Sequence, residues 1–128
     1  MGESDGIHRE LSERVIGAAI EVHRALGPGL LESAYEACLA HEMLNMAIPF
    51  ERQVPLPIEY KGELVDCGYH LDSLVDGKII LELKSIDSFA SIHDAQLLTY
   101  MRLARVRLGL LMNFNVRVLV DGIRRRVL

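Results

Sequence analysis

Two carboxylates and a lysine recur within a short stretch that has the pattern of a β-hairpin. Asp72 stands near the end of one predicted strand, and Glu82 and Lys84 close the next, with an Asp76-Gly77 turn between them. Because side chains alternate along a strand, Glu82 and Lys84 point to one face, and the hairpin can bring Asp72 beside them. Hard cations such as Mg²⁺ take oxygen ligands, one or two of them protein carboxylates. The stretch therefore predicts a cation site, with a lysine able to orient or deprotonate a water.

The same three residues allow a second interpretation, in which Glu82 and Lys84 form an ordinary ion pair on a solvated face. Burial of charged groups removes their hydration, so burial without a use is costly. The residue types alone leave both interpretations open.

Helical spacing of apolar residues predicts two helices before the hairpin, over residues 8–26 and about 30–46. Gly27-Pro28-Gly29 ends the first helix. In the second, Leu31 and Tyr35 are expected on the buried face. Glu32 falls in the first turn, where a carboxylate also complements the helix dipole, so its position alone does not indicate a ligand.

The predicted strands cover residues 49–60, 63–75, 78–84 and 107–114, with a short terminal hairpin over 116–120 and 123–128. Pro55 and Pro57 place the first strand at a sheet edge. The continuous apolar character of residues 107–114 is typical of a strand buried on both faces. With a helix over residues 91–104, the order is α-α-β-β-β-α-β-(β), a mixed sheet flanked by helices.

The third helix carries a polar stripe, His93, Gln96 and Tyr100, at helical spacing. Such a stripe is usually a solvated face, but an amide and a phenol one turn apart could also reach the hairpin and bond water or phosphate. Ser91 is expected to cap this helix.

At 128 residues the chain is expected to form one domain, residues 1–128, with residues 1–7 as a loose tail. No apolar run is long enough to span a membrane and the N-terminus lacks a signal-peptide pattern, so a cytosolic protein is expected. Cys38 and Cys67 have no metal-type spacing, and buried free thiols are expected rather than a disulfide.

The net charge of −4 is unevenly distributed: residues 1–84 carry −8 and residues 85–128 carry +4. An acidic total does not exclude nucleic-acid binding, which needs only a local basic footprint. Arg124-Arg125-Arg126 is the one short basic cluster, and it suits either solvated surface or phosphate contacts.

Five blocks in order resemble the GxxExxY proteins of the PD-(D/E)XK nuclease-like superfamily. The naming motif stands here as Gly29-Leu30-Leu31-Glu32-Ser33-Ala34-Tyr35. The other blocks are 50–53, the Asp72 hairpin with Glu82-Leu83-Lys84, the helix with Gln96 and Tyr100, and 109–114. The resemblance covers nearly the whole chain, and the core order of that superfamily, α-β-β-β-α-β, agrees with the order predicted from periodicity. It implies an α/β (α+β) restriction-endonuclease-like fold.

The resemblance also implies roles for individual residues. Asp72 and Glu82 would be metal ligands for Mg²⁺ or Mn²⁺, and Glu32 would complete the metal shell from its helix. Lys84 would position the attacking water or stabilise charge on the phosphate. Gln96 and Tyr100 match a Gln-x-x-x-Tyr element that lines the site and helps to bind substrate.

The sequence departs from the family before the aspartate, where His70 stands in place of a frequent arginine and Ser73 follows in place of a usual leucine. His70 should share a strand face with Asp72 and, when protonated, could donate to a phosphate. The missing permanent charge bears on substrate affinity more than on metal binding.

The leading hypothesis is a Mg²⁺- or Mn²⁺-dependent nuclease that hydrolyses phosphodiester bonds of DNA or RNA. The alternative is a non-catalytic binding or assembly module of the same fold, as a homodimer or a subunit of a complex. A small-molecule or redox enzyme has little support, because no glycine-rich nucleotide loop is present and the cysteines are not spaced for a cluster.

Overall fold

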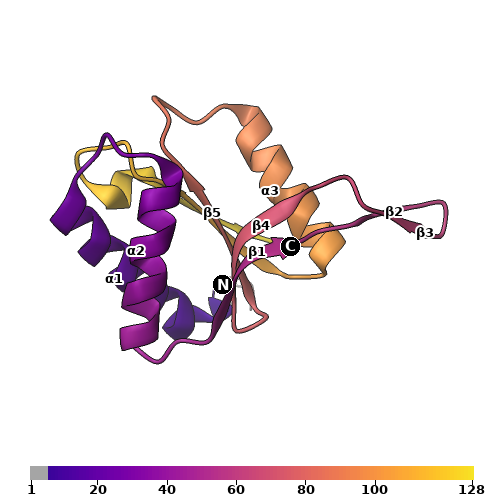
Figure 1. Ribbon diagram of the computed structural model, residues 1–128, viewed down its shortest axis with the longest axis horizontal. Coiled ribbons are helices and arrows are strands. Elements are labelled where there is room, and N and C mark those ends of the chain that lie inside the picture. Colours follow the sequence, from indigo (N-terminus) through magenta and orange to yellow (C-terminus); the bar gives the residue numbers. More distant parts are fainter. Residues whose placement is uncertain (1–5) are drawn as a thin grey trace.

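A five-stranded mixed sheet with helices on both faces forms the body of the molecule in the computed structural model, which describes residues 6–128 (Figure 1). The elements are α1 (Arg9–Leu26), α2 (Glu32–Asn45), β1 (Phe50–Pro55), β2 (Ile58–Tyr60), β3 (Glu63–Val65), β4 (His70–Val75), β5 (Ile79–Lys84), α3 (Ser91–Ala104), β6 (Leu108–Asn113), the 3₁₀-helix η2 (Leu119–Gly122) and β7 (Ile123–Val127). This α+β architecture confirms the predicted fold class.

The strand order in the main sheet is β1-β4-β5-β6-β7. β5 and β6 are parallel and the other neighbours are antiparallel. The proline-containing strand β1 lies at an edge, and β6 is an interior strand buried at every residue, both as predicted. β5 therefore runs through the middle of the sheet, and its last three residues, Glu82–Lys84, pair with β6 alone.

Two apolar clusters cover the two faces of the sheet. Ile79, Leu81 and Leu83 pack with α1 and α2, whereas Ile80 on the opposite face packs with Leu97 and other residues of α3. Alternation along β5 therefore places Glu82 and Lys84 on the same face as Ile80, toward α3.

The predicted Asp-Gly turn joins β4 to β5. Asp76 and Gly77 both have positive φ, 51° and 64°, and the N–H of Lys78 donates to the carbonyl of Val75 at 2.8 Å. Two successive left-handed residues are the geometry of a tight hairpin turn, and an Asp-Gly pair tolerates it.

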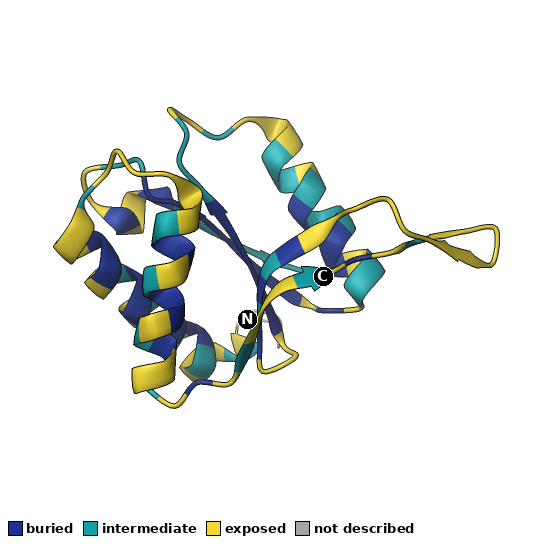
Figure 2. Cartoon of the chain, viewed as in Figure 1, coloured by how far each residue is buried: buried dark blue, intermediate teal, exposed yellow. Residues whose placement is uncertain are grey.

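The predicted strands 49–60 and 63–75 are each broken in two, which is a correction. β2 and β3 pair only with each other and form an arm that projects from the body and is exposed along most of its length (Figures 1 and 2). Pro57 has no N–H to continue the ladder. On the return side, Gly68 has φ 77° and its N–H is bonded by the Asp66 carboxylate at 3.0 Å, so the chain turns there.

The predicted strand over 116–120 is also wrong. That segment leads into η2, which begins at Leu119, and β7 pairs with β6 instead of with its own predecessor. His23 on α1 explains the difference, because its Nε2 lies 3.1 Å from the carbonyl oxygen of Phe114 and 2.8 Å from that of Val116. These contacts hold the chain after β6 against α1 and away from a strand partner.

Smaller expectations about helix caps and burial are also corrected. Leu31 is exposed, because it is the N-terminal cap residue of α2 and lies outside the helix. Ser91 does not cap α3; Ala90 occupies the cap position, and its N–H donates to Nδ1 of His93 at 2.8 Å. The cysteines are free thiols as expected, although Cys67 is exposed and Cys38 only half-buried.

Residues 1–5 of the predicted tail lie outside the described residues, and Ile7 packs against the core. No described helix combines the length and apolar character needed to cross a membrane.

Candidate functional site

Asp72 and Glu82 face each other at the point where the β4–β5 ladder ends. The two strands pair from Val75–Ile79 only as far as Ser73–Leu81. Beyond that point the side chains replace the ladder: Oε2 of Glu82 accepts the N–H of Asp72 at 2.9 Å, and Oδ2 of Asp72 accepts the N–H of Leu83 at 2.8 Å. Each carboxylate is thus fixed by the other residue's strand, and one oxygen of each has no hydrogen bond to a described residue.

Burial and mutual repulsion make this pair of carboxylates unusually basic. Burial of Glu82, which is 5% exposed, together with the charge of Asp72, raises the pKa of Glu82 from an ordinary 4.5 to about 8. Burial also raises the pKa of Asp72, against the N–H bond from Leu83. A cation placed between the two free oxygens would remove the repulsion that raises both pKa values.

Lys84 lies two residues beyond Glu82 on the same face of β5. Its charge lowers the pKa of Asp72 and of Glu82, but by less than burial raises them. Lys84 makes no ion pair with any residue of 6–128, so its ammonium group is available to another anion. The backbone here is fixed, since the N–H of Phe114 donates to the Lys84 carbonyl at 2.9 Å.

Glu32 approaches the end of β5 from the first turn of α2. Its Oε2 accepts the N–H of Ser85 at 3.2 Å, and its charge contributes to the raised pKa values of Asp72 and Glu82. Tyr35 sets this position: its hydroxyl donates to the carbonyl of Gly27 at 2.6 Å and accepts the N–H of Leu30 at 3.1 Å. The tyrosine of the Gly-x-x-Glu-x-x-Tyr motif thus anchors the loop that presents the glutamate.

Gln96 and Tyr100 reach the same region from α3. Nε2 of Gln96 donates to the Tyr100 hydroxyl at 3.0 Å, and the charges of Glu82 and Asp72 help to raise the pKa of Tyr100 after burial, the largest cause. The Tyr100 hydroxyl is therefore within electrostatic range of both carboxylates. His70 is exposed at the start of β4, two residues before Asp72.

Glu36 is part of this acidic region and was missed by sequence reasoning. It is buried one turn after Glu32, and its charge raises the pKa of Asp72 more than that of Glu32 does. Arg52 on β1 binds its Oε2 through two nitrogens, at 2.9 and 3.1 Å, and Gln53 donates to Oε1 at 2.6 Å. The four-residue spacing from Glu32 put both on one helix face, but nothing in the sequence showed that Glu36 is buried.

The residues partly fit a divalent cation. Asp72 and Glu82 are oxygen donors from neighbouring strands with one free oxygen each, and Mg²⁺ is commonly held by one or two carboxylates together with waters. Within the part of the chain that the structure describes, no three His, Cys, Asp or Glu side chains are gathered as a metal-binding group. The donor set therefore suits a cation that keeps most of its water, with Glu32 held nearby by Ser85.

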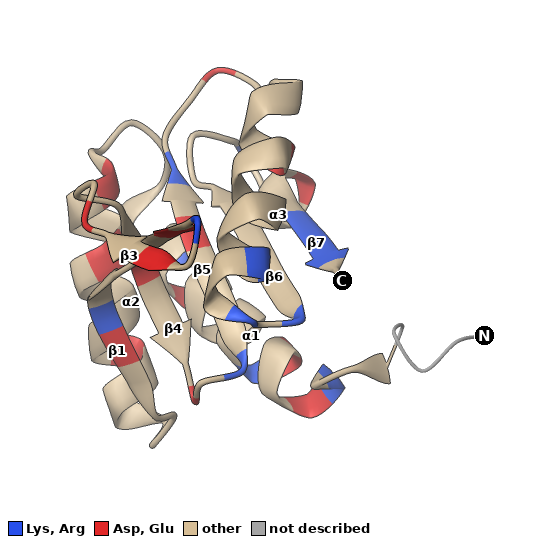
Figure 3. Ribbon diagram, turned by 90° about the vertical axis from the view of Figure 1, so that its right-hand side faces the viewer, with Lys and Arg blue, Asp and Glu red and all other residues tan. Residues whose placement is uncertain are grey.

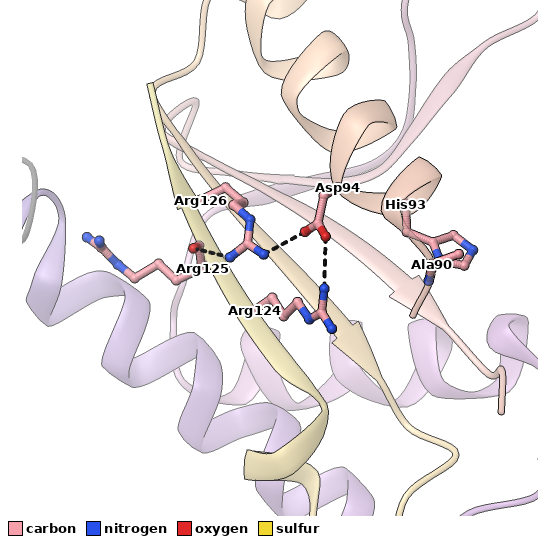
Figure 4. A network of polar contacts seen from close by, with 6 residues as sticks. All are labelled: Ala90, His93, Asp94, Arg124, Arg125 and Arg126. Carbon is pink, nitrogen blue, oxygen red and sulfur yellow. Dashed lines mark hydrogen bonds and ion pairs between the residues drawn. The ribbon is translucent and has the colours of Figure 1, made fainter. Parts of the chain in front are cut away.

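The basic cluster on β7, blue in Figure 3, is largely neutralised. Asp94 at the start of α3 binds Arg124 at 2.8 Å and Arg126 at 2.7 Å (Figure 4). Arg124 also lies over the ring of Phe89, 4.6 Å from its centroid. Two of the three arginines thus tie α3 to the sheet, and their charges are already paired.

Comparison with known proteins identifies the family of the chain. No curated protein and no solved structure matches the chain. Residues 9–126, from the start of α1 to the penultimate residue of β7, match the profile of the PD-(D/E)XK nuclease superfamily. The chain therefore belongs to the PD-(D/E)XK nuclease superfamily.

Proposed function

We propose that this chain is a metal-dependent nuclease that hydrolyses phosphodiester bonds of DNA or RNA with Mg²⁺ or Mn²⁺, and that it is one of the GxxExxY proteins within the superfamily. The observation that carries the proposal is the Asp72–Glu82 carboxylate pair at the parting of β4 and β5, with the unpaired Lys84 on the same face. Membership of the nuclease superfamily supports it.

Asp72 and Glu82 would hold the cation through Oδ1 and Oε1, the oxygens left free by the backbone contacts. Glu32 would serve as a further ligand, directly or through water. When bound, the cation supplies Lewis-acid charge beside a phosphoryl oxygen and makes a bound water more acidic.

The remaining residues act on the substrate and the water. Hydrolysis joins a water oxygen to phosphorus and breaks the bond to the leaving oxygen, which takes up a proton. Lys84 can hold the attacking water or offset the charge that develops on the phosphate. Gln96 and Tyr100 offer an amide and a phenol from α3, and His70 adds a charge when protonated.

Metal binding is the first test, because it needs no knowledge of the substrate. Mn²⁺ is titrated by calorimetry into the wild-type protein, an Asp72→Asn variant and a matched Asp121→Asn variant, whose aspartate is exposed in η2. We expect binding in the wild type and Asp121→Asn, and its loss in Asp72→Asn. Absence of binding in the wild type at millimolar Mn²⁺ near neutral pH would overturn the nuclease proposal.

Cleavage is then tested with single- and double-stranded DNA and RNA in Mn²⁺. We expect Lys84→Ala to retain Mn²⁺ binding but to lose cleavage by about 10²-fold or more, the size typical of a charge acting in the transition state. Equal cleavage by wild type and Lys84→Ala would indicate a contaminating nuclease.

A non-catalytic binding or assembly module is the second candidate, favoured by the arm. Tyr60 and Leu64 on β2 and β3 are 61% and 72% exposed, and a two-stranded hairpin alone is only marginally stable in water. Such an arm suits a partner or a second copy of the chain. Intact Mn²⁺ binding with no cleavage of any of the four nucleic acids would favour this candidate.

A further inference from the structure

A cavity of about 270 Å³ lies between α3 and the base of the arm. Gln96 and Tyr100 line it from α3. Ile58 and Tyr69 line it from the two segments by which the chain enters and leaves the arm. Tyr100 belongs to both places, because its pKa responds to the charge of Glu82. Tyr100 is therefore a side chain that the cavity and the candidate site share.

The lining of the cavity suits an uncharged flat ring. It contains no Lys, Arg, Asp or Glu; its apolar members include Ile58, Ile92 and Leu103, together with the two tyrosine rings. A phosphate would find no cation there. The volume is also below the roughly 300–1,000 Å³ of pockets for drug-sized ligands, which favours a single ring system.

The two tyrosines can make aromatic contacts to such a ring. Their centroids are 6.0 Å apart and their planes meet at 59°. Tyr69 is 45% exposed, so part of its ring is open to a ligand, whereas Tyr100 is buried. A ring stacked on Tyr69 would meet Tyr100 at a steep angle, and stacked and edge-on contacts are the two arrangements that aromatic rings favour.

The cavity also offers hydrogen bonds to the edge of a ring. Gln96 uses one N–H for the Tyr100 hydroxyl, which leaves its Oε1 and second N–H for a ligand. Thr99 adds a hydroxyl, whose oxygen accepts from Arg102 at 3.2 Å. Aromatic surface with an amide and a hydroxyl at its edge is the chemistry that binds a nucleobase.

We propose that this cavity holds one unstacked nucleobase of the substrate, next to the phosphate that Lys84 and the carboxylate pair act upon. A base inside a duplex is stacked and paired, so only a single strand, an overhang or an extruded base can enter. The proposal rests on the proposed nuclease function for its choice of ligand, and it deepens that function by naming single-stranded nucleic acid as the substrate class.

The test compares oligonucleotides with and without bases. Fluorescent dT12 and U12, and abasic chains of the same length and charge, are bound to the protein in EDTA so that no cutting occurs. The variants are Tyr69→Leu, Tyr69→Phe and Tyr60→Leu; Tyr60 is an arm tyrosine, more exposed than Tyr69, that does not line the cavity. Thermal unfolding verifies that each variant is folded.

We expect the wild type to bind dT12 or U12 roughly tenfold more tightly than the matched abasic chain, as one stacked base provides. Tyr69→Leu should remove this preference, and Tyr69→Phe and Tyr60→Leu should keep it. No preference in the wild type, no binding of either oligonucleotide, or a preference that survives Tyr69→Leu would overturn the base cavity. Base-dependent binding without cleavage in Mn²⁺ would overturn the nuclease function and leave the cavity standing.

Discussion

Glu82 is the residue whose environment departs furthest from that of an ordinary carboxyl group. Its burial is not relieved by an ion pair, and the charge that acts on it most strongly is that of another carboxylate, Asp72. A protein that needs only stability gains by replacing such a group with a neutral one. The arrangement is understandable where the charge serves a bound cation.

Metal-free protein should become less stable as pH rises from about 4.5 to 8. In this window the unfolded chain has ionised Glu82 and the folded chain still holds the proton, so the free energy of unfolding falls by up to about 1.4 kcal/mol per pH unit. The raised pKa of Asp72 acts in the same direction. Glu82→Gln should therefore be more stable than wild type by a margin that grows with pH.

Urea unfolding in EDTA at several pH values measures that margin. Glu59→Gln is the matched control, because Glu59 is exposed on β2 and should show no such growth. A margin that is constant from pH 5 to 8 would contradict the assigned environment of Glu82.

The ion pair between Glu36 and Arg52 leads to a second prediction at the scale of single residues. Arg52→Met removes two hydrogen bonds from a carboxylate whose side chain is 10% exposed, and should destabilise the protein by about 2 kcal/mol. Arg102→Met, at an exposed arginine whose side chain donates to the hydroxyl of Thr99, should change stability by less than about 0.5 kcal/mol. Equal effects in chemical unfolding would show that Arg52 does not support Glu36.

At the scale of elements, the sequence predicted what is determined locally. The Asp76-Gly77 turn, the two N-terminal helices and the interior strand follow from turn chemistry and periodicity, and so did the meeting of Asp72 with Glu82. The arm was not predictable, because Leu56, Ile58 and Tyr60 alternate as in a half-buried strand although Tyr60 is 61% exposed. The contacts of the buried Glu36 depend on Arg52, and the path of the chain after β6 depends on His23. Both partners are distant in sequence from the residues they hold.

The contact between α3 and β6 also controls the site, because α3 carries Gln96 and Tyr100. A Cβ on Gly109 would lie 2.8 Å from Cδ1 of Leu97 and 2.8 Å from Sδ of Met101, both on α3. Gly109→Ala should therefore push the helix outward and destabilise the fold by about 1–3 kcal/mol.

Gly17→Ala is the matched control, since Gly17 is exposed within α1 and a Cβ there meets nothing within 4 Å. It should stabilise the protein by roughly 0.5–1 kcal/mol through helix propensity. Chemical unfolding of both variants measures the effects, and a neutral Gly109→Ala would mean that α3 is not seated closely on β6.

At the scale of the whole molecule, the charge distribution limits how nucleic acid can be bound. The chain carries −4 overall, and Arg124 and Arg126 are already paired with Asp94. Near the carboxylate pair, Lys84 is the cation that the described residues leave unpaired. Without a bound metal, affinity must then come mainly from contacts to bases, and less from phosphate neutralisation.

This charge distribution predicts that the affinity for a single-stranded oligonucleotide depends only weakly on salt concentration. Each phosphate neutralised on a single strand contributes roughly −0.7 to the slope of log K against log salt concentration. With about two or three such contacts, the slope for dT12 should be no steeper than about −2, whereas binding to the matched abasic chain should be weaker at every salt concentration. Fluorescence anisotropy over a salt series in EDTA measures both. A slope of about −5 or steeper would mean that a basic surface, and not the base cavity beside Tyr100, supplies the affinity.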